Sequence, residues 1–294
     1  SLAHQALLIQ SFYKESLEVN IYIPDPALRE YVLNISTVKA CLPESAGEAV
    51  TPYPPTPFQS LFFYCNDPIY MSKSGHAAFE KQPATILTGP QFSRVNIKVV
   101  GRLHAIRVDF LPGALHRFLG IPMTELFDGG FDAADFWGSE LRSLHEQIQQ
   151  EQDIKVAKSL VEKFLIKKAA ALHSVLPFHE AMKEMLRKQG NIRIEDSASI
   201  ACMGLRQFER KCKEIIGMGP KTYARILRFS KAYRLHEAFP GLSWTKIAYE
   251  AGYYDQMHLI RDFKLFAGVN PTIIEQELQH TPLRMQKDLR IYEA

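Results

Sequence analysis

Residues 242–268 read LSWTKIAYEAGYYDQMHLIRDFKLFAG, and this stretch decides the fold of the second half of the chain. It predicts a short helix, a tight turn and a second helix that ends at Gly268. Gly252 can adopt the positive φ that a sharp turn requires, and Asp255 stands where an N-cap carboxylate accepts hydrogen bonds from free backbone amides. Apolar residues recur at helical spacing over 259–266, so the second helix has one buried face. The pattern is that of a helix-turn-helix unit.

The opposite face of the second helix carries the side chains that we expect to be functional. They lie near its N-terminal end and are Gln256, Met257, His258 and Arg261. This end of such a helix enters the major groove of double-stranded DNA, where Arg pairs with guanine edges and Gln with adenine edges. We therefore predict that the four residues contact DNA, against the alternative that Arg261 is an ordinary solvated arginine. We expect His258 to be a surface hydrogen-bonding group rather than a metal ligand.

An imperfect copy of the motif runs over 194–217 as IEDSASIACMGLRQFERKCKEIIG. Its second helix leaves Arg206, Glu209 and Arg210 exposed, and we predict that they are further DNA contacts. The alternative for the two arginines is a solvated helix face or a salt bridge. Two roles remain open for Glu209, because a carboxylate can accept a hydrogen bond from cytosine or can orient a neighbouring arginine. Cys202 occupies the turn position that glycine holds in the other copy, so we expect it to strain the first turn.

The first half of the chain has the pattern of a β-rich domain. Strands are predicted over 58–65, 84–88, 92–100 and 103–110, and the last of them has side chains that alternate with a period of two. Four prolines between 52 and 57 forbid helix and indicate a loop or a sheet edge. A helix over 153–168 is predicted to close this domain. The predicted fold class is α+β, with a β-rich domain over 1–172 and an all-α domain with two helix-turn-helix motifs over 173–294.

Composition and charge restrict the classes of function. The chain is 46% hydrophobic and 23% charged, which is typical of soluble globular proteins, and no apolar run approaches the ~20 residues that span a bilayer. Residues 187–294 carry 18 Lys and Arg against 12 Asp and Glu, for a net charge of +6, whereas the rest has a net charge of −3. Such a basic half fits a domain that faces a polyanion.

The cysteines and histidines indicate neither a disulfide framework nor a metal site. Cys41, Cys65, Cys202 and Cys212 lie far apart without Cys-x-x-Cys spacing, and we expect them to be reduced, buried thiols in a cytoplasmic protein. No secretory signal stands at the beginning of the sequence. The ten histidines show no metal-ligand spacing, and no cofactor fingerprint occurs, so we predict no metal and no cofactor.

The two motifs resemble the AraC/XylS family of bacterial transcription regulators over about residues 177–278. The second copy and the stretches 206–210 and 217–223 stand at the spacing of that family, apart from Cys202 and from Met257, where a polar residue is more usual. The resemblance implies two helix-turn-helix subdomains joined by a long helix, here 220–237, with recognition helices in major grooves ~34 Å apart. Within that helix we expect Arg228 to be a structural ion-pair partner. The first half resembles, more loosely, the β-rich sensor or dimerisation domain of one group within the family.

These observations favour a sequence-specific DNA-binding transcription regulator that is not an enzyme. The resemblance implies control by a small-molecule effector or by homodimerisation through the first domain, and contact with RNA polymerase if the protein is an activator. The alternative is a DNA-binding domain fused to an unrecognised enzyme or protein-interaction module, although no nucleophile elbow, phosphate loop or dinucleotide motif occurs. Four side chains either line an effector pocket or belong to the core, so no effector residue is assigned. They are Phe62, Phe63, Tyr64 and His104.

Overall fold

The computed structural model describes residues 17–42, 47–73, 78–172 and 176–290. It confirms the α+β class, because a β-rich part built from two antiparallel sheets is followed by helices alone. One sheet has the order β1-β2-β9-β4-β7-β10, with strands β1 (Leu17–Tyr22), β2 (Val32–Cys41), β4 (Ser60–Tyr64), β7 (Thr85–Thr88), β9 (Arg102–Phe110) and β10 (Gly130–Asp132). The other has the order β3-β8-β5-β6, with strands β3 (Glu48–Tyr53), β5 (Tyr70–Lys73), β6 (Glu80–Lys81) and β8 (Val95–Val100).

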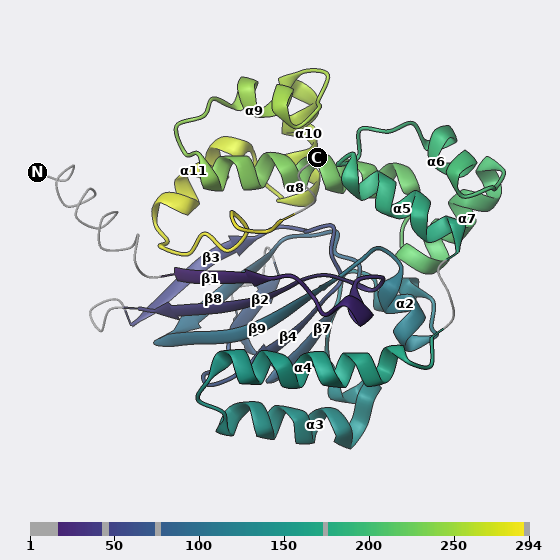
Figure 1. Cartoon of the computed structure of the whole chain (residues 1–294). Helices are drawn as coiled ribbons and strands as arrows, with labels where there is room; N and C mark the ends of the chain where they lie inside the picture. The colour runs from purple at the N-terminus through teal and green to yellow at the C-terminus, as the bar shows by residue number, and fades with distance from the viewer. Residues whose placement is uncertain (1–16, 43–46, 74–77, 173–175, 291–294) are drawn as a thin grey trace, which may run out of the picture.

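The alternation predicted for β9 separates two apolar layers. Ile106 and Val108 are fully buried on the outer face of the six-stranded sheet, which two helices cover (Figure 1). Ala105 and Arg107 point the other way, toward the four-stranded sheet. The helices are α3 (Ala134–Gln150) and α4 (Ile154–Ala169), and the second confirms the helix predicted over 153–168. The proline-rich stretch begins in β3, which is an edge strand, where a residue that cannot donate a backbone hydrogen bond is tolerated.

Three short helices belong to the β-rich part: η1 (Pro26–Leu28), α2 (Ala114–Leu119) and η2 (Met123–Leu126). η1 contacts α4, whereas η2 contacts α7 and the start of α2 lies against Ile215 of the helical part. The helical part then consists of α5 (Pro177–Arg187), α6 (Ile194–Ile200), α7 (Leu205–Ile216), α8 (Pro220–Ala238), α9 (Trp244–Glu250), α10 (Gln256–Phe266) and α11 (Pro271–Gln279). The pairs α6–α7 and α9–α10 are the two predicted helix-turn-helix units, and α8 is the predicted connecting helix (Figure 1). None of these described helices has both the length and the apolar character that a membrane span requires.

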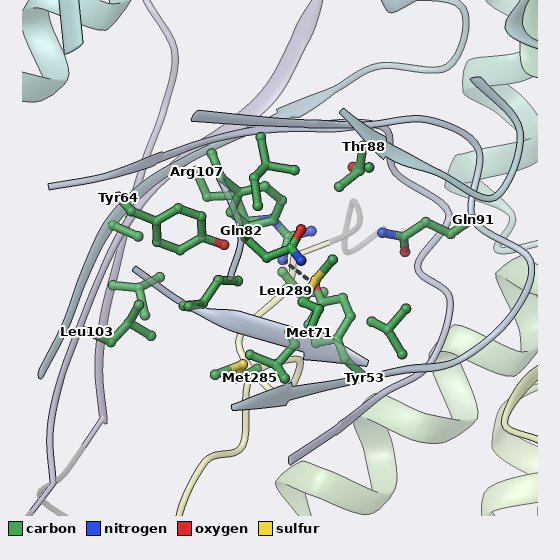
Figure 2. Close-up of a pocket in the computed structure, with 18 of the residues that line it drawn as sticks. Tyr53, Tyr64, Met71, Gln82, Thr88, Gln91, Leu103, Arg107, Met285 and Leu289 are labelled. Carbon is green, nitrogen blue, oxygen red and sulfur yellow. Dashed lines mark hydrogen bonds between the residues drawn. The ribbon is translucent and has the colours of Figure 1, made fainter. Parts of the chain in front are cut away.

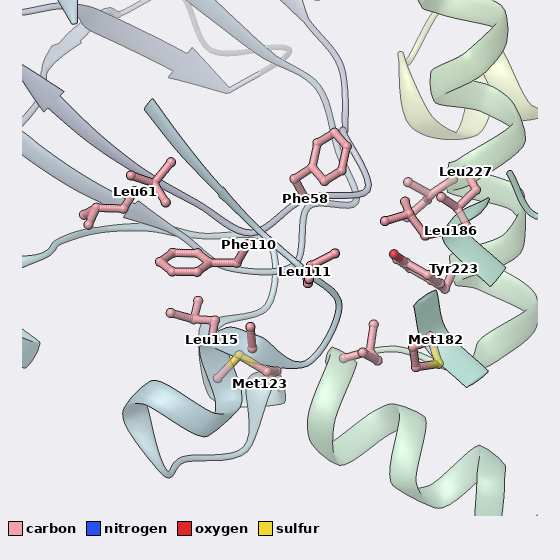
Figure 3. Packing of buried hydrophobic residues seen from close by; sticks show 14 of the residues in the cluster. Phe58, Leu61, Phe110, Leu111, Leu115, Met123, Met182, Leu186, Tyr223 and Leu227 are labelled. Carbon is pink, nitrogen blue, oxygen red and sulfur yellow. The ribbon is translucent and has the colours of Figure 1, made fainter. Parts of the chain in front are cut away.

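The β-rich and helical parts share one continuous core. Phe58, Leu111 and Met123 belong to the same buried cluster as Tyr223 and Leu227 of α8 (Figure 3). The contact is close enough to require glycine at the end of α7. Gly217 has φ +89°, and a Cβ atom there would lie 2.4 Å from the Pro90 side chain. The helical part is therefore packed tightly on the β-rich part. The domain boundary between residues 172 and 173 stays a prediction.

Candidate functional site

The turn of the second helix-turn-helix unit is built as its sequence predicts. Gly252 has φ +83°, and a Cβ atom there would lie 2.2 Å from the Asn191 side chain. Asp255 caps α10, since its Oδ1 accepts hydrogen bonds from the His258 backbone amide at 2.9 Å and pairs with His258 Nδ1 at 2.8 Å. The hydrogen bond from that amide is the main cause that lowers the pKa of the Asp255 carboxyl below its usual value. The first turn of α10 is thus held in place from its own N-cap.

The four residues predicted on the outer face of α10 are all exposed. Gln256, Met257, His258 and Arg261 lie together on the first turn and a half of the helix. Gln256 is oriented by the preceding helix, because its Oε1 accepts a hydrogen bond from Thr245 Oγ1 at 2.9 Å and leaves the amide N–H groups for another acceptor. Arg261 forms no ion pair within the described part of the chain.

Sequence reasoning missed two exposed tyrosines beside this face. Tyr254 in the turn before α10 is 93% exposed, and Tyr249 at the end of α9 is 80% exposed. Large aromatic side chains that stay this exposed often mark a contact surface, and phenol groups commonly bind phosphate. For Tyr254, its place directly before the N-cap Asp255 was the available signal.

The first unit presents a similar surface on α7. Arg206 and Arg210 are exposed, Glu209 is half-buried, and neither arginine forms an ion pair among the described residues. An orienting role of Glu209 toward the arginines therefore finds no support in the described contacts. Cys202 has φ +54°, so a non-glycine residue adopts the left-handed conformation at the turn, as expected from its position.

Helix α8 connects the two helix-turn-helix units and packs against helices of both. The prediction that Arg228 is an ion-pair partner is wrong. Its guanidinium donates to the carbonyl of Gly190, which follows α5, at 2.8 Å, and it forms no ion pair among the residues that the structure describes. The ion pair on α8 is made by Arg225, which donates to Asp262 of α10 at 2.7 Å. Sequence reasoning did not identify Arg225, because its partner lies 37 residues away on another helix.

The β-rich part encloses a cavity of about 450 Å³ between its two sheets (Figure 2). Phe62 and Tyr64 are among its lining residues and stack with ring centroids 6.1 Å apart. Phe63 and His104 are not, since the alternation along β4 and β9 points them to the opposite face. Of the four candidates left open above, two therefore line the cavity.

One polar region of the cavity lining is a buried ion pair. Arg107 Nε donates to Asp109 Oδ1 at 2.6 Å, and its Nη1 donates to the Tyr53 hydroxyl at 2.9 Å. The negative charge of Asp109 balances the positive charge of Arg107, so this region of the cavity carries no net charge. Burial is the main cause that raises the pKa of Tyr53 above its usual value, and the phenol stays protonated.

The segment that follows α11 returns to the β-rich part. Residues 281–290 bring Met285 and Leu289 into the cavity wall (Figure 2). The segment is held by Thr51 Oγ1, which donates to the Leu283 carbonyl at 3.1 Å, and by Gln286 Nε2, which donates to the Pro54 carbonyl at 2.8 Å. We call residues 281–290 the return segment. Together with α11, it connects the second helix-turn-helix unit to the cavity.

The expectation of buried thiols holds for two of the four cysteines. Cys65 and Cys212 are buried, as expected, whereas Cys41 and Cys202 are exposed, so the expectation of buried thiols was wrong for two of the four. All four are free. Burial raises the pKa of the Cys65 thiol to about 11. No group of His, Cys, Asp and Glu suited to a metal ion occurs among the described residues.

Two family models match the chain, one in the β-rich part and one in the helical part. A family model described as a helix-turn-helix domain matches residues 197–277, and a model described as a domain of unknown function (DUF6597) matches residues 20–132. No curated protein matches the sequence.

Three solved structures align with most of the chain at low sequence identity. ToxT from Vibrio cholerae is 11% identical with a TM-score of 0.45, and the match covers 90% of this chain and 99% of ToxT. Its structure with a bound unsaturated fatty acid is also 11% identical with a TM-score of 0.45, and covers 92% and 97%. The AraC-like transcriptional activator CuxR is 8% identical with a TM-score of 0.23, and covers 94% and 89%. All three TM-scores lie below 0.5.

Proposed function

We propose that this chain is a DNA-binding transcription regulator of the AraC family rather than an enzyme. Its helix-turn-helix domain would read DNA through the N-terminal ends of α7 and α10. The proposed contacts are Arg206, Glu209, Arg210, Gln256, Met257, His258 and Arg261. The proposal rests on the environment of Arg206, Arg210 and Arg261. All three are exposed and form no ion pair among the described residues. Unpaired guanidinium groups on a recognition helix are available for guanine edges and phosphates.

Selection of bound fragments from a random pool of double-stranded DNA tests this function. Two recognition helices on one rigid support predict a site of two sequence elements about one helical turn, ~34 Å, apart. A single short element would mean that one unit does not read bases. No enrichment over random DNA would contradict sequence-specific binding altogether.

We further propose that the N-terminal domain controls the DNA-binding domain through a small-molecule effector in the cavity. The volume of about 450 Å³ suits a small ligand, and the lining is largely apolar, with aliphatic and aromatic side chains on both sheets. Since Arg107 is already neutralised by Asp109, the cavity favours an uncharged and largely apolar molecule over an anion.

The return segment supports this control, because Leu289 lines the cavity while its carbonyl accepts a hydrogen bond from Arg234 of α8 at 3.0 Å. A ligand in the cavity would thus contact a segment that is attached to the connecting helix. A rise in melting temperature with members of a library of neutral small molecules would support the proposal. Without such a rise, homodimerisation through the N-terminal domain is the better account, and sedimentation across a concentration series measures it directly. Contact with RNA polymerase follows only if transcription assays identify the protein as an activator.

A further inference from the structure

A second pocket lies outside the DNA-binding face and adjoins the cavity, with which it shares residues of β1 and of the return segment. It has a volume of about 620 Å³ and is lined by residues of β1, of helix α8 and of the return segment, together with Gln189, which follows α5. Its lining differs in character from that of the cavity, because four cations line it against one carboxylate. The cations are Lys231 and Arg234 of α8 with Lys287 and Arg290 of the return segment, and the carboxylate is Asp288. We call this the basic pocket.

Arg234 is the most informative residue in the basic pocket. Its Nε donates to the Ser230 carbonyl at 3.2 Å and its Nη1 donates to the Leu289 carbonyl at 3.0 Å. Its Nη2 is buried and has no hydrogen-bond partner, and no carboxylate of the described residues forms an ion pair with it. Burial lowers the pKa of the guanidinium to about 10, which still leaves it charged at neutral pH. A buried charge without a counter-ion is costly, so an anion at this position would be bound favourably.

The neighbouring groups match an anion that also carries a hydrogen-bond donor. Gln189 lines the same pocket, and its Oε1 is buried without a partner. Lys231 forms no ion pair among the described residues; burial is the main cause that lowers its pKa, and the charge of Glu250 on α9 opposes that effect. An unsatisfied donor and an unsatisfied acceptor in one cationic pocket fit a hydrogen phosphate group, whose anionic oxygens accept and whose P–OH donates.

We propose that the basic pocket binds a small phosphate or phosphate monoester through Arg234, Lys231, Lys287 and Gln189. The anion would contact the N-terminal domain at β1, the connecting helix α8 and the return segment together. It would therefore strengthen the attachment of α8 to the β-rich part, on which the relative placement of the two helix-turn-helix units depends. The proposal does not rest on base reading by α7 and α10, since it concerns a different face of α8.

Isothermal titration calorimetry of the full chain with inorganic phosphate, at constant ionic strength, tests the proposal. The test variant is Lys231→Gln/Lys287→Gln, which removes two cations of the pocket. The matched control is Lys155→Gln/Lys163→Gln, which removes the same charge from exposed positions on α4. A parallel titration with glycerol 3-phosphate distinguishes the free ion from an ester as the better ligand. We expect saturable binding by the wild type and the control, and at least tenfold weaker binding by the test variant.

A second variant and a DNA measurement make the outcome unambiguous. Arg234→Lys keeps the charge but lacks Nη2, so it should also weaken phosphate binding while circular dichroism reports a folded protein. Absent binding by the wild type, or an equal loss in the control, would overturn the proposal. The proposal would also be overturned by a DNA measurement on Lys231→Gln/Lys287→Gln. If the slope of log DNA affinity against log salt concentration fell by about two in magnitude, the pocket would be a contact for the DNA backbone. Arg261→Ala should leave phosphate binding unchanged, which keeps this test independent of the DNA-binding proposal.

Discussion

The guanidinium of Arg225 on α8 lies 2.7 Å from the carboxylate of Asp262 on α10, and Asp262 is buried. The second carboxylate oxygen of Asp262 accepts a hydrogen bond from the Tyr253 hydroxyl at 3.0 Å. This ion pair fixes the rotation of the recognition helix α10 relative to the connecting helix. Because the side chains that face DNA are set by that rotation, the pair is a structural determinant of the proposed interface.

Loss of the arginine from this pair should destabilise the protein. Arg225→Ala leaves a buried carboxylate without its counter-charge, and the half-exposed position of Arg225 reduces the cost to about 2 kcal/mol in the free energy of unfolding. Chemical denaturation measures this loss. The control Arg193→Ala breaks an exposed pair with N···O 3.8 Å and should cost below about 0.5 kcal/mol. The double variant Arg225→Ala/Asp262→Asn should recover part of the lost stability, because the buried position is then uncharged. Equal instability of the single and the double variant would argue against the ion pair as the cause.

Arg261 should contribute to the choice of DNA sequence. Arg261→Ala is expected to reduce the difference in binding free energy between the selected site and random DNA by about 1 to 3 kcal/mol, because a base-reading guanidinium discriminates between base pairs. Competition binding at fixed salt concentration measures the difference. Arg102→Ala, an exposed arginine in the N-terminal domain, is the control and should leave it unchanged. Equal weakening on both DNAs would assign Arg261 to backbone contact alone.

The turn of the first unit should be improved by glycine. Cys202 has φ +54°, a conformation that costs a residue with a Cβ atom about 1 to 2 kcal/mol, while glycine loses about 0.5 to 1 kcal/mol more backbone entropy on folding. Cys202→Gly is therefore expected to raise the free energy of unfolding by about 0.5 to 1 kcal/mol. Cys202→Ala retains the Cβ atom and should give no such gain. A thermal denaturation series compares the three proteins, and equal stabilisation by alanine would show that the thiol rather than the backbone is responsible.

Glu237 should make stability depend on pH near neutrality. Burial raises the pKa of this carboxyl from 4.5 to about 7, although the Gln286 backbone amide donates to it at 2.8 Å and Arg284 attracts its charge. Since the folded state holds the proton more tightly than the unfolded state, the stability from this group is fully present below pH 4.5 and is lost as the pH rises through about 7. The loss amounts to about 3 kcal/mol.

The variant Glu237→Gln cannot ionise but can still accept the hydrogen bond from Gln286. Its free energy of unfolding should therefore decrease less than that of the wild type between about pH 5 and about pH 8. Urea denaturation at each pH measures both profiles. Parallel profiles would assign the pH dependence to other groups.

Local signals in the sequence were sufficient for the helical half. The positive φ at Gly252, the N-cap at Asp255 and the extent of α8 each depend on residues within one or two turns of the chain, so they could be predicted before any coordinates. The alternation of side chains with a period of two likewise predicted that β9 has two different faces. It could not say which face meets helices and which encloses a cavity, because a strand carries no information about the layer that will cover it.

The sequence by itself determined that two helix-turn-helix units follow a β-rich domain, and which side chains lie on the outer faces of α7 and α10. Tertiary structure alone decided the partner of Arg225, the return of residues 281–290 to the cavity and the isolation of Arg234 in a basic pocket. The physical reason is separation along the chain. Backbone caps and periodicity act between neighbouring residues, whereas the return segment contacts residues more than 200 positions away, through packing that no local pattern encodes.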